Sequence, residues 1–162
     1  MILIAGIGNI FFGDDAFGSE LARRLQSREW PEDVRVVDFG IRGIDLLYAL
    51  METDDAAVLI DAAPRGGSPG TLYWIEPDLW QDGDATAIET HSLDPMQVLS
   101  AARQMGAAPR RVFVLGCEPE ALDGMGLSDV AGRALEEALA MIDDLLQRIR
   151  TEKEIYEPGK TH

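Results

Sequence analysis

The sequence predicts an α/β fold with three α/β/α layers. In this fold, helices cover both faces of a twisted, mostly parallel sheet of about five strands with one antiparallel edge strand. Short apolar runs alternate with segments whose apolar residues recur at helical spacing, as in parallel sheets with crossover helices. The run at 71–76 follows the preceding strand after a turn too short for a crossover helix, so we expect it to be antiparallel. The length of 162 residues fits one domain.

The first half of the chain contains three predicted strands and two predicted helices. The strands are the apolar runs at 1–8, 34–39 and 56–62. Phe17, Leu21 and Leu25 recur at four-residue intervals and predict the first helix. The second helix is the stretch 44–51. Strand 56–62 is the most apolar of the three, so we expect it to be central and covered on both faces.

The second half begins with a glycine- and proline-rich turn at 64–70, which leads into the predicted edge strand at 71–76. Asp94 as N-cap and Pro95 in the first turn predict a helix over 94–105. A buried strand follows at 111–118, and the final helix starts at Ser128. We therefore expect a single domain over 1–150 and a C-terminal tail over 151–162.

The composition excludes several classes of partner. The chain has 29 acidic and 14 basic residues and a formal net charge of −15, and a surface this negative repels nucleic acids and anionic membranes. No apolar stretch reaches the roughly 18 residues of a membrane span, so membrane insertion is not expected. Cys117 is the only cysteine, which fits the reducing cytoplasm.

Carboxylates follow three of the predicted parallel strands. Asp15 follows the first strand, Asp38 lies at the end of the second, and Asp61 lies at the end of the third. His91 stands in a connection that could return over the same edge. Ligands of such folds bind beyond the carboxyl ends of the strands, and carboxylates with an imidazole can hold a divalent transition metal. The sequence therefore predicts a metal site at this edge.

Each of these residues also has a structural interpretation. Asp14 could cap the first helix, with Asp15 in its first turn, Asp38 could cap the turn into the second helix, and His91 could be an ordinary loop residue. Asp61 is harder to explain in this way, because a carboxylate ending a buried strand is costly without partners or a cleft. These alternatives remain open for every position but Asp61, where function is favoured.

Two other chemistries find weaker support. Cys117 ends a buried strand, where a lone cysteine is more often a small apolar residue than a nucleophile, and no serine stands in a G-x-S-x-G motif. The glycines after the first strand do not complete G-x-G-x-x-G, since position 11 is Phe11. Asp38 nevertheless lies where a ribose-binding acid would, so a dinucleotide-binding oxidoreductase stays an alternative.

Five segments together resemble the endopeptidases that mature the large subunit of nickel-iron hydrogenases. They are "ILIAGIGNIFFGDDAFG", "DFGIRGIDLLYAL", "VLIDAAPRGGSPGTLYWIEP", "THSLDPMQVL" and "LGCEPEALDGMGLS". The resemblance implies a protease that removes a C-terminal extension from the hydrogenase precursor after nickel insertion. It also implies that Asp15, Asp61 and His91 bind the metal and carry catalysis. Asp38, with Gly40 and Arg42 of the same loop, would recognise the substrate.

We therefore expect a cleavage that a metal directs and that carboxylates assist, without a serine or cysteine nucleophile. Nickel would arrive bound to the precursor, and other divalent metals could occupy the site in vitro. Asp61 or Asp15 would assist the attacking water. We expect a monomeric, cytoplasmic enzyme whose partner is the hydrogenase precursor. A nickel-binding assembly scaffold without proteolysis is a further alternative.

Overall fold

The computed structural model describes residues 1–77 and 93–156. Its strands form one sheet in the order β2-β1-β3-β5-β4. The strands are β1 (Ile2–Ile7), β2 (Val34–Gly40), β3 (Ala56–Ala62), β4 (Leu72–Ile75) and β5 (Arg111–Cys117). All neighbouring pairs are parallel except β4 with β5, which is antiparallel at the sheet edge. The predicted fold class and the antiparallel edge strand are confirmed.

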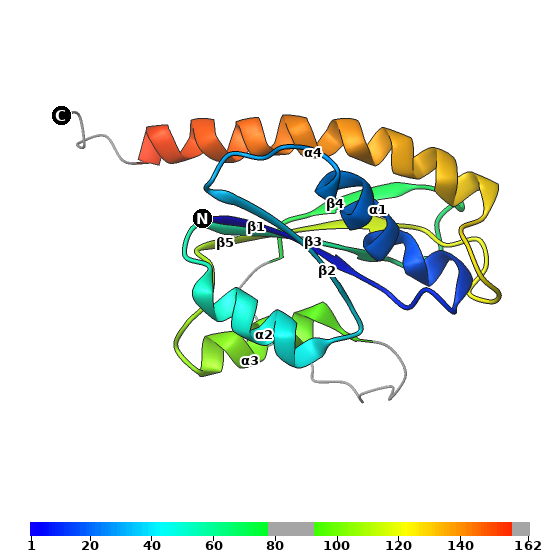
Figure 1. Ribbon diagram of the computed structural model, residues 1–162, viewed down its shortest axis with the longest axis horizontal. Coiled ribbons are helices and arrows are strands. Elements are labelled where there is room, and N and C mark those ends of the chain that lie inside the picture. The colour runs from blue at the N-terminus through cyan, green and yellow to red at the C-terminus, as the bar shows by residue number, and fades with distance from the viewer. Residues whose placement is uncertain (78–92, 157–162) are drawn as a thin grey trace.

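Helices cover both faces of this sheet (Figure 1). Helices α1 (Phe17–Gln26) and α4 (Asp129–Tyr156) lie on one face, and α2 (Gly43–Glu52) and α3 (Pro95–Gln104) lie together on the other. Each face has its own apolar core, built from the inward side chains of the strands and of the two helices that cover it. None of the helices within the described ranges has the length and apolar character needed to span a membrane.

Two glycines bring α1 close to the sheet at the end where β1 leads into it. A Cβ at Gly6 of β1 would lie 2.3 Å from the carbonyl oxygen of Gly18, and a Cβ at Gly18 would lie 2.0 Å from that of Ile60. Neither distance is compatible with a side chain, so the contact requires glycine at both positions. The start of α1 is therefore held directly over β1 and β3.

The last helix differs from the prediction at its C-terminal end. We expected a tail from residue 151, whereas α4 continues to Tyr156. Arg111 of β5 forms ion pairs with Glu152 of this extra segment and, at 3.2 Å, with Glu76. The Thr151 hydroxyl also donates to the Gln147 carbonyl over 2.9 Å. These contacts tie the added turn to the sheet, so the boundary predicted at 150 falls inside a helix.

Candidate active site

Asp15 lies in a short 3₁₀ helix, η1 (Gly13–Ala16), between β1 and α1. Its carboxylate accepts a hydrogen bond from the Asn9 amide over 2.9 Å. Gly8 packs against the backbone of Asp15 so closely that a Cβ there would lie 2.0 Å from the Asp15 carbonyl oxygen. The turn that follows β1 is thus folded against η1, and it fixes the position of the Asp15 carboxylate.

Asp61 lies near the end of β3, and its carboxylate accepts a hydrogen bond from the Ala62 amide over 2.8 Å. Part of the residue reaches the surface, but the protein around the carboxyl removes most of its hydration. This desolvation raises the pKa of Asp61 well above 3.8, and the negative charges of Asp15 and Asp94 raise it further, against the Ala62 hydrogen bond. Because β1 and β3 are parallel neighbours, Asp15, which follows β1, and Asp61, near the end of β3, lie at the same carboxyl edge of the sheet.

Asp94 was predicted only as a helix cap, and it does cap α3 by accepting a hydrogen bond from the Met96 amide over 2.9 Å. The negative charge of Asp94 also raises the pKa of Asp61. The N-terminal end of α3 is therefore directed at the same edge of the sheet as the two candidate carboxylates. The sequence did not indicate this second property of Asp94.

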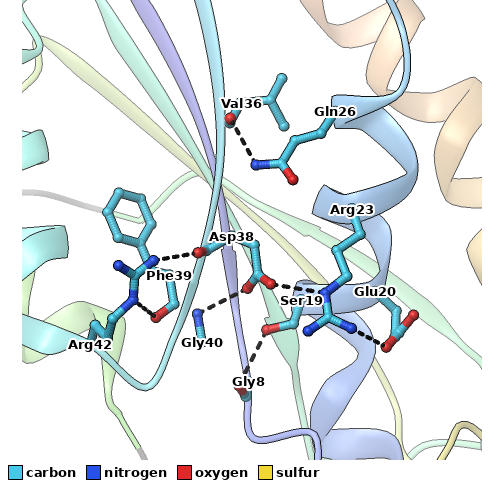
Figure 2. Close-up of polar contacts among 10 residues, drawn as sticks. All are labelled: Gly8, Ser19, Glu20, Arg23, Gln26, Val36, Asp38, Phe39, Gly40 and Arg42. Atoms are coloured by element: carbon cyan, nitrogen blue, oxygen red, sulfur yellow. Dashed lines mark hydrogen bonds and ion pairs between the residues drawn. The ribbon is translucent and has the colours of Figure 1, made fainter.

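Asp38 is held by two neighbouring segments (Figure 2). One carboxylate oxygen accepts from the Gly40 amide over 3.0 Å, and the other accepts from Nε of Arg23 on α1 over 3.2 Å. The Gly40 carbonyl in turn accepts from the Gly8 amide over 3.0 Å, so the loop after β2 is joined to the loop after β1. Asp38 therefore caps the turn that leads into α2, through the Gly40 amide, whereas Arg42 occupies the N-cap position of α2 itself and makes no side-chain capping bond there.

Arg42 folds back over its own loop (Figure 2). Its guanidinium donates to the carbonyl of Asp38 over 2.7 Å and to that of Phe39 over 3.2 Å. It also pairs with Asp45 of α2 over 3.1 Å. These contacts make Arg42 a brace for the turn that presents Asp38 and Gly40.

Asp14 has a different role from its neighbour Asp15. Its side chain is buried and accepts from the amides of Glu120 at 2.8 Å, Ala121 at 3.3 Å and Ser128 at 2.7 Å, and from the Ser128 hydroxyl at 2.8 Å. Burial alone would raise the pKa of Asp14, but these hydrogen bonds outweigh it and lower the pKa below 3.8. The alternative in which Asp14 caps the first helix is wrong, since the N-cap positions of η1 and α1 are Phe12 and Ala16 and neither makes a side-chain capping bond.

Ser128 completes this link and stands directly before α4, which begins one residue after its predicted start. Its hydroxyl donates to Asp14 and accepts from the Ala131 amide over 3.2 Å. Asp14 thus joins η1 to the start of α4 and fixes the segment that carries Asp15.

Glu118 is a second buried carboxylate that the sequence analysis did not single out. It accepts hydrogen bonds from the amides of Arg65, at 3.0 Å, and Gly67, and from the Tyr73 hydroxyl at 3.1 Å. It therefore holds the turn that follows Asp61. In the sequence, Glu118 could have been noticed as a glutamate at the end of a buried strand. Its hydrogen-bond partners could not have been identified, because they lie at distant positions in the chain.

The remaining candidate residues are Cys117 and His91. Cys117 is buried, and burial, with the charges of Asp14 and Glu118, raises the pKa of its thiol to about 12. A thiol this weakly acidic supplies no thiolate nucleophile at neutral pH. His91 lies outside the described residues. Within the described ranges no three His, Cys, Asp or Glu side chains are arranged to hold a metal ion.

Several known proteins are similar to this chain in sequence. Residues 19–145 match the family model described as hydrogenase maturation protease. HoxM of Azotobacter vinelandii, a hydrogenase expression/formation protein, is 33% identical over 90% of this chain and 72% of the relative. HupD of Rhodobacter capsulatus is 32% identical over 77% of this chain, which spans 60% of that relative's length. The hydrogenase 2 maturation protease of Escherichia coli is 29% identical, with 87% of each chain covered.

Solved structures show the same likeness. The hydrogenase maturating endopeptidase HybD from E. coli superposes with a TM-score of 0.79 at 29% identity, covering 91% of this chain and 92% of that one. The nickel-iron hydrogenase maturation protease HycI from Thermococcus kodakarensis superposes with a TM-score of 0.72 at 29% identity, covering 90% and 92%.

Proposed function

Because this chain belongs to the hydrogenase maturation protease family, a family of endopeptidases, we propose that it removes a C-terminal extension from the precursor of a nickel-iron hydrogenase large subunit once nickel is inserted. The observation that carries this assignment is the pair Asp15 and Asp61 at the carboxyl edge of a sheet with this family's fold.

In the proposed mechanism the nickel arrives with the precursor and is bound by Asp15, Asp61 and His91. A carboxylate with a raised pKa is a stronger base than an ordinary aspartate, and Asp61 has such a pKa. Asp61 therefore assists the attacking water, while Asp15, held by the Asn9 amide, helps to position the metal and the peptide bond. Other divalent metals occupy the same carboxylates in vitro.

Substrate recognition is assigned to the turn after β2. Asp38 and Gly40 are presented at the same edge, and Arg42 braces the turn through backbone carbonyls. Among the described residues, the Asp38 carboxylate accepts hydrogen bonds from Gly40 and Arg23 alone, which leaves acceptor capacity for groups on the precursor.

The alternatives are less well supported. A dinucleotide needs an open backbone at the glycine turn, whereas Gly8 is packed against Asp15. Family membership favours proteolysis over a scaffold role. We further propose that the enzyme is cytoplasmic and monomeric, which cell fractionation and sedimentation would test.

The deciding experiment compares nickel-loaded with nickel-free precursor as substrate. Nickel-loaded precursor should be shortened at its C-terminus, and the nickel-free form should stay intact. Equal cleavage of both would contradict the nickel dependence. Absence of cleavage in both, with a precursor that a known relative does cut, would contradict the protease assignment for this chain.

A further inference from the structure

Large apolar side chains are exposed mainly at one edge of the sheet. Ten such side chains are exposed among the described residues. Two lie in the connection after β1, three in the segment from the end of β2 into α2, two after β5 and one in the first turn of α3. Met1 and Met105 lie at the opposite edge. Single exposed apolar residues are normal, whereas a gathered patch marks an interaction site.

Six of these side chains define a surface that we call the apolar rim. They are Phe11, Phe12, Ile41, Ile44, Tyr48 and Met125, which are between 44% and 71% exposed. The segments that carry them are joined by backbone hydrogen bonds. The Gly13 amide donates to the Gly124 carbonyl over 2.7 Å, and the Gly8 amide donates to the Gly40 carbonyl over 3.0 Å. The rim therefore belongs to one connected part of the molecule, which also carries Asp15.

Packing of the core does not account for the rim. The inward side of α2 is formed by Leu46, Ala49 and Leu50, which are buried, whereas Ile44 and Tyr48 are 70% and 59% exposed. Positions on the outer face of a surface helix are usually polar. Apolar residues there lower solubility without adding to the core, so another requirement explains them.

The charge pattern indicates an apolar partner surface. The chain as a whole carries a net charge of −15, but the only cation between Ile41 and Tyr48 is Arg42, which is paired with Asp45. Aromatic residues and methionine are enriched at protein–protein interfaces, whose cores are depleted in charge. The rim has this composition, and it directly adjoins the candidate carboxylates.

We propose that the apolar rim docks the folded body of the hydrogenase precursor, so that its C-terminal extension reaches Asp61. This inference rests on the proposed function and adds to it the surface that recognises the substrate. A partner that presents a peptide at this edge must cover the loops after β1, β2 and β5, and those loops carry the rim together with the adjoining part of α2. Stable protein contacts bury about 800 Å² on each partner, more than an extended peptide at two carboxylates supplies.

The test uses the double variant Ile44→Ser/Tyr48→Ser, with Met105→Ser as the matched control. Met105 has the same exposed fraction as Tyr48, 59%, but lies at the opposite edge. Neither variant contains a residue of the proposed catalytic site. Truncating a hot-spot residue near the centre of an interface weakens binding by about tenfold or more. The double variant should therefore raise KM for nickel-loaded precursor about tenfold at unchanged kcat, while the control stays within about twofold.

Direct binding of the precursor, measured by biolayer interferometry, separates the possible results. Weaker binding by the double variant and unchanged binding by the control support the docking surface. Equal affinity for all three proteins would overturn it, even where cleavage proceeds normally. If the rim instead joins two copies of this chain, sedimentation would show a wild-type dimer that the double variant loses while its KM stays unchanged, which also overturns the proposal. A wild type that binds the precursor without cutting it would contradict the proposed function and leave the docking surface supported.

Discussion

Replacing Asp14 by asparagine tests whether the first aspartate of the pair is a structural link. The variant keeps the size of the side chain but turns one carboxylate oxygen into an amide nitrogen. One oxygen of Asp14 accepts three hydrogen bonds, from the Glu120 and Ala121 amides and the Ser128 hydroxyl, and the other accepts one, from the Ser128 amide at 2.7 Å. The amide oxygen of asparagine can accept the first three hydrogen bonds only if its NH₂ turns toward the Ser128 backbone amide. That amide is itself a donor, so its hydrogen bond is lost.

The expected cost follows from these contacts. A lost hydrogen bond to a charged group costs roughly 1.5–3 kcal/mol, and a neutral acceptor in place of a charged one weakens the others. We therefore expect Asp14→Asn to lower the free energy of unfolding by about 3 kcal/mol. The matched control is Asp143→Asn, since Asp143 is 57% exposed and pairs only with Arg28 among the contacts described. An exposed pair of this kind is worth less than about 1 kcal/mol.

Urea unfolding at several pH values measures the loss of unfolding free energy in Asp14→Asn and in the control Asp143→Asn. Because the folded pKa of Asp14 lies below its ordinary value of 3.8, its ionisation contributes stability above pH 3.8 that is lost as the pH falls through the folded pKa. The stability difference between wild type and Asp14→Asn should be largest near neutral pH and shrink under acid. A loss no greater than that of Asp143→Asn at pH 7 would refute the structural role.

Three further substitutions address the candidate site. Asp61→Asn should abolish cleavage yet stabilise the protein at neutral pH. Because the pKa of Asp61 is raised, its ionisation costs the wild type stability as the pH rises from 3.8 through the folded pKa; a stability difference between wild type and Asp61→Asn that is the same at pH 4 and pH 8 would contradict this. Arg23→Gln should raise KM for the precursor several-fold at unchanged kcat, because the Asp38 carboxylate loses the guanidinium that holds it in place. Partial rescue by Arg23→Lys would separate the effect of charge from that of geometry, and an unchanged KM would rule out that Arg23 positions Asp38. Asp15→Asn should weaken nickel binding in calorimetry by about tenfold, since a neutral donor replaces an anionic one, with little change in melting temperature; an isotherm identical to wild type would remove Asp15 from the ligands.

The sequence predicted those features that depend on local pattern. Apolar runs located all five strands, and the short turn before Leu72 identified β4 as antiparallel. The N-cap at Asp94 was predicted correctly because a cap is specified within two residues of the helix start. The end of α4 was not predicted, because the pairing of Glu152 with Arg111 depends on two positions far apart in the chain.

The site was predicted in part, for the same reason. Asp15 and Asp61 could be placed at one edge from the rule that parallel strands end together. The roles of Asp14 and Glu118 could not be predicted, because their hydrogen-bond partners are backbone amides of distant loops. A sequence does not mark such amides in any way, so adjacent aspartates look equivalent until the fold is known.

The most direct test of the account is the mass of the hydrogenase large subunit after incubation of nickel-loaded precursor with wild-type enzyme or with Asp61→Asn. The wild type should shorten the subunit by one C-terminal fragment, and Asp61→Asn, although folded, should leave it at full length. A subunit shortened equally by both proteins would contradict the central claim that the carboxylate at the end of β3 carries the cleavage.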